Sequence, residues 1–340
     1  MGNSPALIQI RDLRKNFGTS TALDGLELNV EHGQVHGFLG PNGSGKSTTI
    51  RIILGLLRSS GGDVTVFGRD PWKDASALHQ RIAYVPGDVS LWPNLSGGEA
   101  IDLLSRLRRG ASNKKDYRER KDRLLAAFEF DPSKKGRSYS KGNRQKVALI
   151  AALATPAQLY VLDEPTSGLD PIMETVFNQE IERVAGDGAT VLFSSHILSE
   201  VERLCDRVTI IRQGKTVETG TLDQLRGLTR SDVSFGVGEA PSVITEAMAK
   251  LRHTPGVQDL ALETTGAESA RIKFTAESQH MAGVLPLLAQ LNAQALTITP
   301  PSLEDLFLRH YTLELAHDGV KQDGFTKDGF TNNGLQAAGQ

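Results

Sequence analysis

The chain reads Gly40-Pro41-Asn42-Gly43-Ser44-Gly45-Lys46-Ser47-Thr48, and this stretch fits the pattern Gly-x-x-x-x-Gly-Lys-Ser/Thr. Glycines allow the backbone to turn tightly, so that several N–H groups face an anionic phosphate chain. We expect the ammonium of Lys46 to reach the β- and γ-phosphates and the hydroxyl of Ser47 to bind Mg²⁺. The stretch therefore predicts a binding site for a nucleoside triphosphate.

The residues on either side of this loop support that prediction. Residues 34–39 read as a short buried strand, and residues 48–57 read as a helix. A helix in this position directs its positive N-terminal end at the phosphates. The alternative is a glycine-rich turn that matches the pattern by chance, and the strand-loop-helix setting argues against it.

Composition limits the class of protein. A chain of 340 residues is long enough for two domains, and its 39% hydrophobic and 23% charged residues are ordinary for a soluble globular protein. The formal net charge of −2 gives no sign of a nucleic-acid partner, and none is expected. Cys205 is the only cysteine, which excludes an intramolecular disulfide and suits a reducing compartment.

Hydrophobic runs predict no membrane span. No stretch reaches 18 apolar residues, and the N-terminus lacks the basic and then apolar build of a signal peptide. We therefore expect a cytoplasmic chain, whose work at a membrane requires a partner.

Hydrophobic periodicity predicts an α/β fold. Alternating apolar and polar residues predict antiparallel strands at 7–13, 26–30 and 64–67. Residues 72–154 read as mostly helical, and apolar strands return at 159–162, 190–194 and 208–211 with helices between them. Strands that alternate with helices indicate a largely parallel sheet.

The pattern changes after about residue 226. Strands are expected at 233–237, 257–262, 271–275 and 296–299, and helices at 241–252 and 279–291. The resulting order βαββαβ is that of a ferredoxin-like domain. A short amphipathic helix is expected at 302–311. We expect an α+β domain over 226–312 and a disordered tail over 313–340, where Gly recurs mostly after Asp or Asn.

A second pair of polar residues follows an apolar strand. Leu159-Tyr160-Val161-Leu162 leads directly into Asp163 and Glu164. We expect Asp163 to bind Mg²⁺ and Glu164 to polarise the attacking water as a general base. Unpaired charges at the end of an apolar strand cost stability, which favours a site over a solvated strand end.

The run from Asp163 to Asp170, Asp-Glu-Pro-Thr-Ser-Gly-Leu-Asp, resembles the nucleotide-binding subunits of ABC transporters. The resemblance covers roughly residues 5–225. It implies the P-loop fold of ABC ATPases over 1–225, with a mixed sheet core, an antiparallel β subdomain and a helical subdomain at about 88–155. It also implies that ATP lies between the phosphate loop of one subunit and the signature motif of a second.

Two stretches compete for that signature motif. Leu95-Ser96-Gly97-Gly98-Glu99 is close to the family's Leu-Ser-Gly-Gly-Gln, but Ser96 lies 67 positions before Asp163. Ser140-Lys141-Gly142-Asn143-Arg144-Gln145-Lys146 lies about twenty residues before it, where the family has its signature, and carries the Arg-Gln-Lys continuation. We therefore assign the signature to Ser140 and Gly142, and interpret Ser96 and Glu99 as a capping box that begins a helix.

The resemblance assigns three further residues. It implies that His196 contacts the γ-phosphate and assists Glu164, that Asp170 crosses the dimer interface, and that Phe17 stacks on adenine. The phenyl ring of Phe17 keeps the π-face needed for stacking. A structural histidine at 196 and a core phenylalanine at 17 are the alternatives.

One position departs from the family. Gly87 stands where a magnesium-contacting glutamine is usual, and glycine supplies no amide side chain. Lys141 likewise replaces the first glycine of the signature.

The segment from Tyr84 to Glu99 and the stretch Pro301 to Phe307 are similar to ATPases that pair with ABC-2-type export permeases. The resemblance implies an ATP- and Mg²⁺-dependent ATPase, working as a homodimer or with another such subunit. It would power export of drugs or antibiotics at the inner face of the cell membrane. A soluble ABC ATPase acting on ribosomes or DNA, and a nucleotide sensor without turnover, remain as alternatives.

Overall fold

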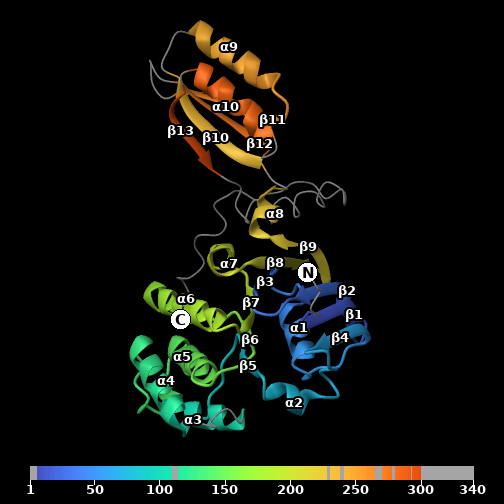
Figure 1. The fold of residues 1–340 in the computed structure, drawn as a ribbon, viewed down its shortest axis with the longest axis vertical. Helices are drawn as coiled ribbons and strands as arrows, with labels where there is room; N and C mark the ends of the chain where they lie inside the picture. Colours follow the sequence, from blue (N-terminus) through green and yellow to red (C-terminus); the bar gives the residue numbers. More distant parts are fainter. Residues whose placement is uncertain are drawn as a thin grey trace, which may run out of the picture. The chain divides into compact units, whose positions relative to one another are not determined.

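The structure is a computed structural model that describes residues 6–108, 114–227, 230–237, 241–264, 270–277, 280–291 and 293–299. The chain divides into two compact units, Met1–Leu225 and Arg226–Gln340 (Figure 1).

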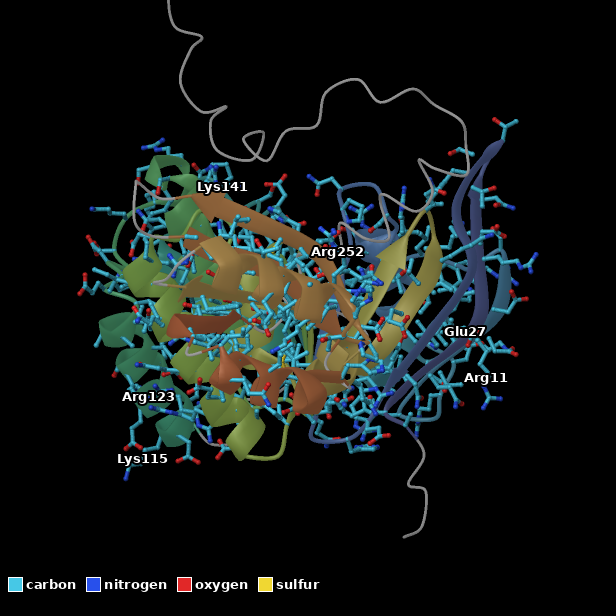
Figure 2. All side chains as sticks on the ribbon, turned by 90° about the horizontal axis from the view of Figure 1, so that it is seen from above. Arg11, Glu27, Lys115, Arg123, Lys141 and Arg252 are labelled. Atoms are coloured by element: carbon cyan, nitrogen blue, oxygen red, sulfur yellow. The ribbon has the colours of Figure 1, made fainter. Side chains whose placement is uncertain are left out.

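The first unit contains an antiparallel sheet of three strands in the order β2-β1-β4. These strands are β1 (Ile8–Phe17), β2 (Ser20–Val30) and β4 (Gly61–Val66). One face of the sheet buries Ile8, Ile10 and Leu13, while Arg11 and Glu27 lie exposed on the outer side (Figure 2). The predicted antiparallel strands are confirmed, and each extends further than its hydrophobic pattern indicated.

The second sheet of this unit has six strands in the order β5-β6-β7-β3-β8-β9. Their bounds are β5 (Ile82–Val85), β6 (Leu159–Asp163), β7 (Thr190–Ser195), β3 (Val35–Leu39), β8 (Arg207–Arg212) and β9 (Lys215–Thr221). The first five pair in parallel, and β9 is antiparallel to β8. All residues of β3, β6 and β7 are buried, as expected for strands of a parallel sheet that is covered on both faces, and these include the polar residues His36, Asp163 and Ser194. The α/β class is confirmed.

Figure 1 shows the helices found between residues 46 and 227. They are α1 (Lys46–Ile53), α2 (Ala75–His79), α3 (Gly97–Leu107), α4 (Lys114–Ala127), the 3₁₀ turn η1 (Gly136–Ser138), α5 (Lys141–Leu153), α6 (Pro171–Gly186), α7 (Leu198–Leu204) and α8 (Leu222–Gly227). Helix α4 is strongly charged, and Lys115 and Arg123 mark it in Figure 2. The guanidinium of Arg123 donates to both carboxylate oxygens of Glu180, at 2.5 and 2.7 Å, and so ties α4 to α6.

Two predictions about these elements were wrong in detail. The helix expected at 48–57 begins at Lys46 and ends at Ile53. Gly55 has φ = 65°, and a Cβ there would lie 2.1 Å from the carbonyl oxygen of Pro71. The chain therefore leaves the helix at this left-handed glycine.

The region expected to be mostly helical, residues 72–154, also contains strand β5. Its four residues pair in parallel with β6, with Tyr84 opposite Val161. A short apolar run of this kind fits either a strand or a buried helix, and the choice depends on the distant partner strand. Strand β9 was not predicted.

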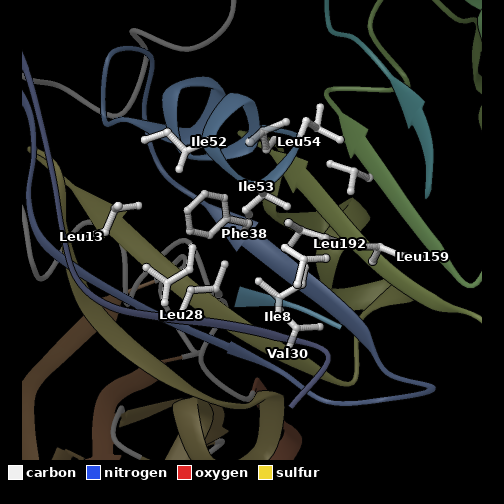
Figure 3. Close-up of a cluster of buried hydrophobic side chains, with 14 of the residues drawn as sticks. Ile8, Leu13, Leu28, Val30, Phe38, Ile52, Ile53, Leu54, Leu159 and Leu192 are labelled. Atoms are coloured by element: carbon white, nitrogen blue, oxygen red, sulfur yellow. The ribbon is translucent and has the colours of Figure 1, made fainter. Parts of the chain in front are cut away.

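The core of this unit lies between the two sheets and α1 (Figure 3). Ile8 and Leu28 from the antiparallel sheet pack with Phe38 of β3, Ile53 of α1 and Leu192 of β7 (Figure 3). Each is almost fully buried, which contributes roughly 1.5–3 kcal/mol per side chain. The core thereby anchors β3 and α1, the two elements that the phosphate loop connects.

The second unit has the elements β10 (Arg230–Val237), α9 (Pro241–Arg252), β11 (Val257–Thr264), β12 (Ala270–Glu277), α10 (Met281–Gln290) and β13 (Gln294–Thr299). The sheet order is β11-β12-β10-β13 with antiparallel neighbours, so the first and third strands are central. The predicted βαββαβ order is confirmed. Phe235 and Phe274 pack in its core with Leu251 and Leu288 from the two helices. The helix expected at 302–311 and the tail at 313–340 lie outside the described residues.

In the described parts of the chain, no helix combines the length and apolar character that a bilayer span requires.

Candidate nucleotide site

The parallel strands end at one edge of the six-stranded sheet, where open α/β sheets place their ligands. The phosphate loop follows β3, Asp163 ends β6, and His196 directly follows β7. Gly87 follows β5 on the same edge. The fold thus brings together residues that lie up to 156 positions apart, from Gly40 to His196.

The phosphate loop has the tight backbone that its glycines predicted. Gly43 and Gly45 have φ values of 81° and 110°, which disfavour any residue with a Cβ. A Cβ on Gly45 would also lie 2.6 Å from the side chain of Leu23. Ser44 N–H donates to Pro41 O at 3.1 Å, which closes the turn. Asn42 and Ser47 are exposed, Thr48 is half-buried, and α1 begins at Lys46, so the helix N-terminus faces this loop.

Lys46 is a buried cation whose hydrogen bonds go to backbone carbonyls. Its Nζ donates to Gly40 O at 2.6 Å and to Pro41 O at 3.2 Å, and it lies 3.8 Å from Glu164 Oε1. Burial lowers the pKa of Lys46, while the charges of Glu164 and Asp163 oppose that shift. The positive charge of a buried ammonium is only partly neutralised by backbone carbonyls. A negatively charged phosphate chain would neutralise it further, so these residues fit a bound nucleotide.

The two carboxylates at the end of β6 differ in their surroundings. Asp163 is buried, and its Oδ1 accepts a hydrogen bond from Ser194 Oγ at 2.6 Å. Glu164 is partly exposed and has φ = 46°, a left-handed backbone that is unusual for a residue other than glycine. Its N–H donates to Ser194 O at 3.0 Å, which holds this conformation. Strain of this kind gathers at functional sites, and sequence reasoning did not detect it.

His196 lies beside Glu164. Its Nδ1 is 3.4 Å from Glu164 Oε1, and its side chain is 49% exposed. The imidazole can therefore orient the Glu164 carboxylate while it remains accessible to a ligand. This contact argues for the functional interpretation of His196.

A magnesium site at this edge would use few protein ligands. The described residues contain no group of three or more His, Cys, Asp or Glu side chains that could hold a metal. Mg²⁺ bound to a nucleotide commonly takes one or two protein oxygens together with phosphate oxygens and water. Ser47, at the start of α1, and Asp163, at the end of β6, fit that donor set.

Phe17 ends strand β1, and this residue is 51% exposed. The Nζ of Lys15 lies 4.9 Å from the ring centroid. The exposure excludes the core interpretation of this residue, and the open ring fits a stacking role.

The two stretches that compete for the signature motif begin different helices. Ser96 is the N-cap of α3, and both hydrogen bonds of its capping box with Glu99 are present, which confirms that prediction. Ser140 is the N-cap of α5, where its Oγ accepts from Asn143 N–H at 3.3 Å. No hydrogen bond or ion pair among the described residues joins Ser140 to the phosphate loop of the same chain.

The start of α5 is instead fastened to the segment that follows Glu164. Lys141 Nζ donates to Ser167 Oγ at 2.7 Å, and a Cβ on Gly142 would lie 2.3 Å from Gly168 O. Asp170 then caps α6 by accepting hydrogen bonds from the N–H groups of Ile172 and Met173. The segment between Glu164 and Asp170 therefore contacts the start of α5 through Ser167 and Gly168, and ends at the N-cap of α6.

Gly87 lies against the carboxylates. A Cβ built on it would be 3.2 Å from Asp163 O and 3.7 Å from Glu164 Cβ. The backbone of the segment after β5 therefore approaches the site closely at the position where the family has its glutamine.

The loop, the buried lysine and the acidic strand end define a P-loop nucleoside triphosphatase. The family model described as ABC transporter matches residues 23–167. The daunorubicin resistance ATP-binding protein DrrA3 of Streptomyces coeruleorubidus is 33% identical over 88% of this chain and 94% of its own. The bacitracin transport ATP-binding protein BcrA of Bacillus licheniformis is 30% identical over 89% and 96%.

Solved structures agree with these sequence comparisons. An ATP-binding subunit of an ABC transporter has a TM-score of 0.61 and 31% identity, and it covers 65% of this chain and 92% of its own. A dimeric bacterial ABC transporter cassette has a TM-score of 0.57 and 26% identity over 63% of this chain and 98% of its own. This chain belongs to the ABC transporter family, as one of its ATP-hydrolysing subunits.

Proposed function

We propose that the chain powers export of drugs or antibiotics through an ABC-2-type permease, as an ATPase bound to the inner face of the membrane. The ATPase part of this proposal rests on one observation. At one edge of the sheet, Glu164 Oε1 lies 3.8 Å from Lys46 Nζ and 3.4 Å from His196 Nδ1. The names of the drug-resistance relatives support the transported class.

Each residue of the site has a task in this proposal. Lys46 and the N–H groups of the phosphate loop bind and orient the phosphates of ATP. Glu164 accepts a proton from the attacking water, and His196 holds the Glu164 carboxylate in place. Mg²⁺, held by Ser47 and Asp163, would neutralise phosphate charge.

The site is completed by a second subunit, either another copy or a related chain. Ser140 and Gly142 of one subunit would meet the γ-phosphate bound by the other, through a hydroxyl and a backbone N–H at the start of α5. Their attachment to the segment 165–168 rather than to their own phosphate loop supports this arrangement. Phe17 would stack on adenine, and Asp170 would lie near the interface.

An apolar groove of about 420 Å³ fits a cytoplasmic segment of the permease. Its walls include Leu56, Tyr84, Trp92 and Leu107, from the core and the helical region 88–155. Leu107 is 69% exposed, which is unusual for a large apolar side chain unless a partner covers it.

Hydrolysis is tested by phosphate release from the purified chain. Glu164→Gln should lower kcat by about 100-fold or more while ATP binding persists, because the amide cannot accept the water's proton. Turnover equal to that of the wild type would refute the assignment of the base.

Docking is tested by co-purification with the permease from membranes. Leu107→Asp should abolish it and leave ATPase activity of the isolated chain unchanged. Leu103→Asp is the control, because Leu103 is exposed on the same helix but does not line the groove. Equal retention of the permease by both variants would contradict the proposed surface.

A further inference from the structure

Glu200 is a buried carboxylate to which the proposed mechanism gives no task. It lies on α7, four residues after His196, and is 8% exposed. Burying a carboxylate is costly, so its retention needs compensating hydrogen bonds. Its Oε2 accepts one from Ser195 Oγ at 2.8 Å.

That hydrogen bond determines the orientation of the Ser195 hydroxyl. A hydroxyl has one proton to donate, and Glu200 Oε2 at 2.8 Å is a closer acceptor than Ile197 O at 3.3 Å. The oxygen of Ser195 is then free to accept, and it receives the N–H of Ile197 at 2.9 Å. This second bond closes a turn around His196, the residue between the two. Glu200 thus fixes the direction of the Ser195 hydroxyl, and the hydroxyl fixes the turn.

The same carboxylate also interacts with the segment that follows Glu164. The hydroxyl of buried Thr166, two residues after Glu164, favours the ionised form of Glu200, as Ser195 does. Burial has the larger effect and raises the pKa of Glu200. Glu200 Oε1 has no hydrogen-bond donor among the described residues.

We propose that Glu200 is a positioning residue that aligns His196 with Glu164, by holding the Ser195 hydroxyl that closes the turn around His196. The contact that it aligns is the 3.4 Å approach of His196 Nδ1 to Glu164 Oε1. In this proposal Glu200 acts through Ser195 and His196 and is not itself a catalytic residue. The proposal rests on the proposed function, because it takes Glu164 as the base.

The test compares kcat, KM for ATP and the His196 ring nitrogens by ¹⁵N NMR in the full-length chain. Glu200→Met removes the acceptor, Glu200→Gln keeps one acceptor oxygen, and Ser195→Ala removes the intermediate hydroxyl. Glu182→Gln on α6 is the control, because it removes an exposed charge. Since small misplacements of reacting groups cost up to about 100-fold, we expect Glu200→Met and Ser195→Ala each to lower kcat by about 10- to 100-fold.

Several results separate positioning from a merely structural role. KM should change by less than about 3-fold, Glu200→Gln should recover most of kcat, and the His196 nitrogen shifts should move in Glu200→Met but not in Glu182→Gln. The double variant Ser195→Ala/Glu200→Met should be no slower than either single one, because both act along one path. If Glu200→Met does not fold, Ser195→Ala alone decides.

Wild-type kcat in folded Ser195→Ala or Glu200→Met, or additive losses in the double variant, would overturn the role of Glu200. A wild-type chain without ATPase activity would instead refute the proposed function.

Discussion

His36 lies in β3, four residues before the phosphate loop, and its imidazole is fully buried. Its Nε2 is 2.8 Å from Thr209 Oγ1 and its Nδ1 is 3.2 Å from Gln34 Oε1. Burial lowers the pKa of His36 to about 3, and the charge of Arg207 adds to the effect. The folded chain therefore keeps this ring neutral at a pH where the unfolded chain protonates it.

This difference makes stability depend on pH. The contribution of neutral His36 is fully present above pH 6.5 and is lost as the pH falls toward 3. At pH 5.5 the loss for this group is about 1 kcal/mol. Urea unfolding at pH 7.5 and 5.5 should show a smaller acid loss in His36→Gln than in wild type. His253→Gln, at an exposed position, should behave as wild type, and an acid loss unchanged in His36→Gln would contradict this account.

Phe17 allows a direct test of adenine stacking. Aromatic stacking on a base contributes about 1–3 kcal/mol, so Phe17→Ala should weaken ATP binding by about 10-fold in calorimetric titration. Phe17→Tyr keeps the ring and should bind ATP within about 2-fold of wild type. Unchanged affinity in Phe17→Ala would show that adenine does not stack on this ring.

At the scale of elements, α3 and α5 each begin with a serine N-cap. Ser96 and Ser140 each accept a hydrogen bond from a backbone N–H three residues ahead. Replacing either by Ala should cost about 1 kcal/mol of stability, the usual value of an N-cap. Only α5 is assigned to the site of a second subunit.

The two serines are therefore a matched pair. Ser140→Ala should lower kcat by at least about 10-fold, whereas Ser96→Ala should leave it near the wild-type value, with thermal unfolding measured on both to compare stability. The reverse order of activities would move the signature motif to residues 95–99.

Much of the site could be predicted because its motifs are contiguous. The phosphate loop and the pair Asp163-Glu164 are local patterns. The residues beside each of them have the pattern of a strand or a helix. The capping box at Ser96 was equally local. Strand β5, the bond from Ser194 to Asp163 and the place of Glu200 depend on contacts between distant segments. Periodicity in one segment carries no information about such contacts.

At the scale of the whole molecule, the proposed function gives one chain two incomplete halves of a nucleotide site. The phosphate loop, Glu164 and His196 lie together, and Ser140 is fastened to the segment after Glu164. In this arrangement ATP must join two subunits before it is hydrolysed, and slow hydrolysis should make the joined state persist.

The most direct measurement is sedimentation velocity of Glu164→Gln with saturating Mg²⁺ and ATP. The account predicts a species of twice the 36.8 kDa chain mass that retains ATP, and its loss in the double variant Ser140→Ala/Glu164→Gln. A Glu164→Gln chain that binds ATP and remains monomeric would contradict the composite site.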